Sequence, residues 1–227
     1  MLALGIVAAL ALAHPAATLA QDSGEDTLQI KDLPGVQTAV SRTYTLDFEA
    51  LFTMEGTPTP EATGPQLFAL GGSIIQFGND DDARGAYTTV LDEVQKQSDA
   101  GVGTPDAVSF ETIDLGADLG DERTGLRMAG DDTGGIASGD IVALVVRDGS
   151  LIYLVTGVAD TGDPSDAVVA FTRSVMDAKA GGDEVTFNED GTSSGGLWDK
   201  FPKADDPVIA GLPSAMDTDL MADESDS

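Results

Sequence analysis

The chain has 227 residues and a formal net charge of −29 at pH 7, because 40 acidic side chains stand against only 11 Lys and Arg. So acidic a surface repels the phosphates of nucleic acids and the anionic lipids of membranes, which excludes nucleic-acid binding and electrostatic membrane binding. The sequence has no Cys, so disulfides, thiol catalysis and lipid attachment to Cys are excluded as well.

The N-terminus has the pattern of a secretory signal peptide. Residues 2–13 form an unbroken apolar run, too short to cross a hydrocarbon core of roughly 30 Å. Small residues at 18 and 20 suit a cleavage site, although no Lys or Arg precedes the run. The start therefore lies upstream of Met1 or a charged leader is dispensable, and the alternative is an apolar core segment. We predict a signal peptide over residues 1–20, a secreted, extracytoplasmic product, and no stable membrane insertion after cleavage.

Cleavage after residue 20 would remove His14, the single His of the chain. The mature protein would then lack the side chains of Ser-His-Asp and Cys-His nucleophile systems and of the usual zinc sites. The phosphate-binding pattern G-x-x-x-x-G-K-[ST] is missing too. Carboxylates remain, but their number alone does not indicate a hydrolase, and aromatic residues for a sugar cleft make up only 5%. We therefore expect no enzyme, and a carboxylate- or metal-dependent hydrolase is the least favoured alternative.

The next segments alternate between strand and helix patterns. Residues 21–39 are predicted to be a flexible acidic leader, and the alternation of apolar and polar side chains from Val40 to Phe52 predicts a strand. A Pro/Thr-rich loop separates it from a second strand at 67–77. Residues 80–98 carry an apolar stripe at helical spacing, with Asn79 or Asp80 as a cap.

The second half of the domain repeats this order. Short strands are predicted at 108–115 and 125–128, followed by two apolar runs, 141–147 and 150–156, joined at Asp148-Gly149 in the manner of a type I′ hairpin. A helix is predicted over 164–180. Sequence echoes between the two halves indicate two ββα-like units. The fold class predicted for residues 40–180 is therefore α+β, an antiparallel sheet of about five to six strands with both helices packed on one face.

Residues 181–227 are rich in Gly, Ser and Asp and are predicted to be an irregular acidic tail. Four large apolar side chains interrupt this composition, and they would anchor the tail either on its own domain or on a partner protein. They are Trp198, Phe201, Ile209 and Leu212.

Acidic clusters are the candidates for binding a metal ion. Asp80, Asp81 and Asp82 follow one another, and calcium takes oxygen ligands from such side chains. The same residues suit the N-terminus of the predicted helix, where negative charge is favourable. No other cofactor is expected.

Two short motifs give the chain a resemblance. Leu119-Gly-Asp-Glu122 precedes a predicted strand, and Arg147-Asp-Gly149 lies at the predicted hairpin. In these features, over roughly residues 67–180, the chain resembles small exported domains of actinobacteria and Chloroflexota-type bacteria, including extracellular sensor domains of Ser/Thr kinases and related lipoproteins. It lacks their disulfides and their lipid-anchoring Cys. The resemblance implies an extracytoplasmic module that binds a ligand or partner, and it assigns no site residue.

The sequence thus favours a secreted, non-catalytic binding or sensor-type domain whose partner is an envelope or extracellular ligand or protein. The alternative is a structural or surface interaction protein that acts through its acidic surface and the segment from Trp198 to Leu212.

Overall fold

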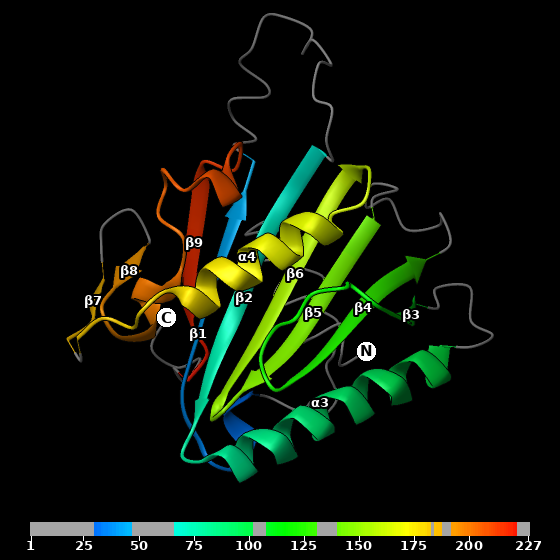
Figure 1. The fold of residues 1–227 in the computed structure, drawn as a ribbon, viewed down its shortest axis with the longest axis horizontal. Coiled ribbons are helices and arrows are strands. Elements are labelled where there is room, and N and C mark those ends of the chain that lie inside the picture. The colour runs from blue at the N-terminus through cyan, green and yellow to red at the C-terminus, as the bar shows by residue number, and fades with distance from the viewer. Residues whose placement is uncertain are drawn as a thin grey trace, which may run out of the picture.

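A computed structural model describes residues 30–46, 66–101, 108–130, 140–182, 184–187 and 192–221. The predicted signal peptide, residues 21–29 of the predicted leader and the Pro/Thr-rich loop lie outside these ranges. Seven strands form one sheet in the order β3-β4-β5-β6-β2-β1-β9, and each neighbouring pair is antiparallel (Figure 1). The strands are β1 (Val36–Thr45), β2 (Gln66–Phe77), β3 (Val108–Ile113), β4 (Glu122–Gly130), β5 (Asp140–Asp148), β6 (Leu151–Thr161) and β9 (Ser214–Asp219).

The remaining elements are two helices and several short pieces. The helices are α3 (Asp80–Gly101) and α4 (Ser165–Asp177). A small ribbon pairs β7 (Thr186–Phe187) with β8 (Ser193–Ser194), and the single turns are η1 (Ile30–Asp32), η2 (Gly196–Lys200) and η3 (Pro207–Ile209). The predicted α+β class with an antiparallel sheet is confirmed, and the prediction of five to six strands is corrected to seven.

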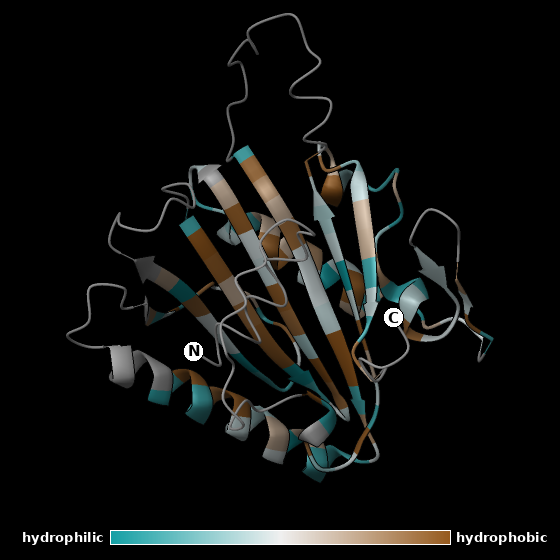
Figure 2. Ribbon diagram, turned by 180° about the vertical axis from the view of Figure 1, so that it is seen from behind, coloured by the Kyte–Doolittle hydropathy of each residue, from teal (hydrophilic) through white to brown (hydrophobic). Residues whose placement is uncertain are grey.

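The helices lie on opposite faces of the sheet, which corrects the prediction that both cover one face. Successive side chains of a strand point to opposite faces. Ile74, for example, lies in the cluster that contains Phe171 of α4, while its neighbour Ile75 lies in the cluster that contains Val90 of α3. Figure 2 shows α3 in front of the sheet and α4 behind it. The order strand-strand-helix does recur in β1-β2-α3 and β5-β6-α4, but the two units do not share a helical face.

The central hairpin joins β5 to β6 as predicted, with a different turn. Asp148 pairs with Leu151, so the two loop residues are Gly149 and Ser150. Gly149 has a φ of 56°, and no non-glycine residue in the described ranges has a positive φ. A single positive φ at the first loop position fits a type II′ turn and not the expected type I′ turn, which needs two.

Both helices begin close to the predicted residues. Asn79 caps α3, because its Oδ1 accepts the backbone N–H of Asp82 at 2.9 Å and its Nδ2 donates to the Asp82 carboxylate at 2.8 Å. At α4, Asp163 accepts the backbone N–H of Ser165 at 2.9 Å. These bonds satisfy N–H groups that a helix leaves without a partner.

The folded unit extends beyond the predicted limits of residues 40 and 180. At its start, Leu33 is buried, and β1 begins at Val36 inside the predicted leader. At its end, β9 pairs with β1 from Thr45↔Ser214 to Val40↔Asp219. The segment predicted as an irregular tail therefore contributes an edge strand and part of the core, although its short turns and connections remain irregular.

Candidate functional site

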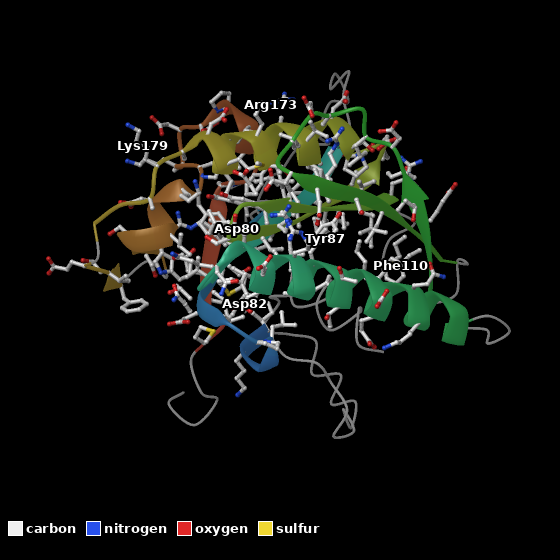
Figure 3. All side chains as sticks on the ribbon, turned by 60° about the horizontal axis from the view of Figure 1, so that its bottom comes forward. Asp80, Asp82, Tyr87, Phe110, Arg173 and Lys179 are labelled. Atoms are coloured by element: carbon white, nitrogen blue, oxygen red, sulfur yellow. The ribbon has the colours of Figure 1, made fainter. Side chains whose placement is uncertain are left out.

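The three consecutive aspartates lie on the first turn of α3. Figure 3 places Asp80 and Asp82 at this end of the helix. Asp82 takes part in the cap described above, and Asp81 Oδ1 lies 3.1 Å from Arg84 Nη1. Within the part of the chain that the structure describes, no group of three or more His, Cys, Asp or Glu side chains is placed to hold a metal ion. Calcium binding at Asp80, Asp81 and Asp82 stays a prediction from the sequence, and the structure gives two of them helix-end roles.

The four apolar residues of the C-terminal segment are buried in their own domain. Trp198, Phe201, Ile209 and Leu212 each expose 3% of their surface and join the cluster that contains Phe171 and Val175 of α4. They anchor the segment to the domain, which is the first of the two alternatives that the sequence left open. In this arrangement a partner has no access to them, so they are not a docking patch.

A buried ion pair holds the same segment. Arg42 of β1 contacts Asp217 of β9 at 2.5 Å through Nε and at 2.7 Å through Nη2, and Nη2 also donates to the Ser193 carbonyl at 2.6 Å. The Ser193 N–H donates to the Asp217 carboxylate. The guanidinium lies 5.8 Å from the ring centre of Trp198 and 5.5 Å from that of Phe201. This cluster of Arg42, Asp217, Ser193, Trp198 and Phe201, hereafter the C-terminal clasp, leaves its charges no access to ligands.

The clasp is extended by two further polar contacts. The Tyr44 hydroxyl donates to the Pro202 carbonyl at 2.5 Å. Lys200 donates to the Met176 carbonyl at 3.2 Å and to the Ala178 carbonyl, at the C-terminal end of α4 where a positive charge is favourable. Burial lowers the pKa of Lys200 from its usual value. Tyr44 and Lys200 thus hold the C-terminal segment on the rest of the domain, so the structure gives them a structural role.

The two motifs of the resemblance meet around one buried arginine. Arg147, which exposes 3% of its surface, lies 3.0 Å from Asp121 Oδ2 and 3.1 Å from Glu122 Oε2. The Gly149 N–H donates to Asp121 at 3.0 Å, and the Asp121 N–H donates to the Arg147 carbonyl at 2.8 Å. The bond from Gly149 is the main cause of the lowered Asp121 pKa. Together the motifs fix the loop before β4 on the central hairpin.

The candidate binding site is a depression beside this loop, on the sheet face that carries α4. It has a volume of about 530 Å³ and lies between the ends of β3 and β4 and the chain that follows β3. That volume falls within the range of roughly 300–1,000 Å³ typical of small-molecule sites. Its lining comprises Thr112, Ile113, Asp114, Leu115, Ala117, Arg123, Thr124, Gly125 and Leu144, and we call it the β3–β4 pocket.

The pocket combines an apolar wall with charged groups at its side. Ile113, Leu115 and Leu144 belong to or pack against the α4-side core. Arg123 Nη1 lies 3.4 Å from Asp118 Oδ1, and Asp114 Oδ1 accepts the Gly116 N–H at 2.8 Å. Tyr87 of α3 contacts the Thr124 hydroxyl at 2.8 Å from the opposite face, which ties this end of β4 to the helix.

The sequence did not point to this pocket. Its residues come from three separate stretches of the chain, and none of them belongs to a motif. The sequence predicted the two short strands at 108–115 and 125–128 that flank the pocket, but it assigned no site between them.

Comparisons of the chain with models of protein families, with curated proteins and with solved structures found no match. The resemblance to exported bacterial domains therefore rests on the two motifs alone. None of the helices in the described ranges combines the length and the apolar character needed to cross a membrane.

Proposed function

We propose that the protein is an exported, non-catalytic binding domain whose small-molecule ligand occupies the β3–β4 pocket. The observation that carries the proposal is the pocket itself, which pairs the apolar wall of Ile113, Leu115 and Leu144 with the guanidinium of Arg123. The exposed lining of the pocket is slightly more polar than apolar, so polar contacts would orient a ligand there.

Export is supported by the sequence features of residues 1–20. The expected product begins at Gln21, after cleavage behind Ala20. Mass spectrometry of the protein recovered from an expressing bacterial culture tests this part. A full-length chain retained with the cells would contradict it.

The side chains that the chain contains support a non-catalytic function. Apart from His14, the chain offers no side chain whose ordinary pKa lies near neutrality, and it has no thiol. The carboxylate of Asp114 in the pocket has no second carboxylate beside it in the lining. The pocket therefore lacks the pair of acidic groups that a carboxylate-dependent hydrolase uses.

A binding screen tests the proposal directly. Backbone amide NMR spectra of the labelled chain are recorded with a fragment collection of neutral, anionic, cationic and zwitterionic compounds. We expect at least one compound to shift the resonances of residues 112–117 and 123–125 in a saturable manner. The proposal is wrong if every compound leaves these resonances in place, or if a pocket ligand is chemically converted.

A variant with a blocked pocket tests whether a ligand found in the screen binds there. Asp114 is exposed and lines the pocket directly after β3, so Asp114→Trp places a large ring at the pocket without disturbing the core. The matched control is Asp92→Trp, an exposed position on α3 that changes the charge equally. Ligand binding should be lost in the first variant and kept in the second.

A further inference from the structure

The β3–β4 pocket offers charges of both signs. Arg123 is 43% exposed in its side chain, and its 3.4 Å ion pair with the fully exposed Asp118 is of a kind that contributes about 0–1 kcal/mol. A ligand can therefore take the place of Asp118 with little loss of stability. Asp114 provides an anionic group on the lining, held by the hydrogen bond from Gly116 N–H at 2.8 Å.

The net charge of the whole molecule determines which ligands can bind favourably to Arg123 and Asp114. With a net charge of −29, the protein repels an anion on approach even though Arg123 attracts it locally. A cation is attracted by the molecule but meets the guanidinium of Arg123 within the pocket. A ligand with one charge of each sign has no net charge, so it avoids the long-range repulsion and still pairs with both groups.

The apolar wall adds a third requirement. Ile113 and Leu115 are only partly buried and offer no hydrogen-bonding side chains, so the part of the ligand that lies against them should be apolar. Burial of such a group contributes roughly 25 cal/mol for each Å² removed from water.

We infer that the ligand of the β3–β4 pocket is a zwitterion of the amino-acid type with an apolar side chain. Its carboxylate pairs with Arg123, its ammonium group pairs with Asp114, and its side chain packs against the partly buried Ile113 and Leu115. The inference rests on the proposed function and specifies the ligand class for the same site.

Three compounds with one side chain separate the possibilities. Leucine is the zwitterion, N-acetyl-leucine keeps only the carboxylate, and leucinamide keeps only the ammonium group. In NMR titrations of the full chain we expect leucine to bind at least about tenfold more tightly than either analogue, with shifts at residues 112–117 and 123–125. The inference is overturned if either analogue binds as tightly as leucine, or if leucine leaves these resonances in place.

The two proposals fail in different ways. If N-acetyl-leucine or leucinamide binds in the pocket as well as leucine does, the ligand class is wrong and the binding function stands. If the pocket resonances respond to none of these compounds and to nothing in the fragment collection, both are wrong.

Charge variants provide the second readout. Arg123→Met removes the cation and keeps an unbranched side chain, and it should weaken leucine binding about tenfold while it strengthens leucinamide binding, because the repulsion of the ammonium group is removed. Arg173→Met is the matched control, because Arg173 is exposed on the outer side of α4 (Figure 3) and the substitution changes the net charge equally. Equal effects of the two variants on leucine binding would overturn the inference, since they would reflect overall charge and not contact in the pocket.

Discussion

Asp217→Asn should destabilise the protein strongly, because it removes the negative charge from the C-terminal clasp. The Asp217 carboxylate accepts from Arg42 Nε and Nη2 and from the Ser193 N–H, and the side chains of Arg42 and Asp217 are only 9% and 4% exposed. Loss of one partner from a buried ion pair costs roughly 3–5 kcal/mol. Since Asn keeps one acceptor oxygen, we expect the lower end, about 3 kcal/mol.

This loss is a large part of the 5–15 kcal/mol that is typical for the unfolding of a domain. With a urea dependence of about 2 kcal/mol per M, the midpoint of unfolding should fall by about 1.5 M. Equilibrium urea unfolding followed by the fluorescence of Trp198, the single Trp of the chain and a member of the clasp, measures the change. Asp205→Asn is the control, because Asp205 is exposed in the same segment.

A double substitution tests the cause of this loss. If the cost comes from the uncompensated charge of Arg42, the combination of Arg42→Met and Asp217→Leu should recover part of the stability, since it removes both charges and fills the space with apolar groups. Recovery is only partial because the Ser193 N–H and carbonyl lose their partners. The reasoning would be refuted if Asp217→Asn unfolded at the same urea concentration as the control, or if the double variant were less stable than Asp217→Asn.

Three further predictions concern titration, an unpaired hydroxyl and salt. Burial raises the pKa of all three tyrosines of the chain, that of Tyr153 to about 12, whereas an unfolded tyrosine titrates near 10. Their contribution to stability is therefore complete below about pH 10 and is lost as the pH rises towards 12. In a pH titration, the phenolate absorbance of the native protein should rise at higher pH than that of the urea-unfolded chain, and coincident curves would contradict this. The Thr156 hydroxyl is buried without a hydrogen-bond partner, so Thr156→Val should leave the urea midpoint unchanged or raise it by up to about 0.5 M, and a clear fall would show that the hydroxyl is used. Because self-repulsion at −29 is screened by salt, raising NaCl from low concentration to about 1 M should raise the melting temperature in differential scanning calorimetry, and a fall would mean that surface ion pairs outweigh the repulsion.

The sequence predicted those strands and helices whose own residues show an apolar run or a helical stripe. The apolar runs around Gly149 predicted the β5–β6 hairpin, and the stripe through Tyr87, Val90 and Val94 predicted α3. The turn type was missed because Asp-Gly and Gly-Ser compete for the loop, and a shift of one residue exchanges type I′ for type II′. Only the register, with Asp148 opposite Leu151, decides between them.

Features that depend on distant neighbours could not be predicted. The side on which a helix lies is set by which residues of β2 and β6 face it, and central strands that are apolar on both faces leave that choice open. The polar sequence of β9 has no strand pattern of its own and is ordered by the free edge of β1. The β3–β4 pocket likewise exists only because the register of β3 on β4, with Ile113 opposite Gly125, brings separate stretches together.

The pairing of β1 with β9 also constrains how the chain reaches its native state. Arg42 and Asp217 are separated by 175 positions, so the outer edge of β1 stays open until β9 has been made. Contacts between such distant residues form slowly, and an open strand edge is a template for pairing with other chains. The strand β9, which covers this edge of β1 and so protects it from self-association, is therefore made long after β1 itself.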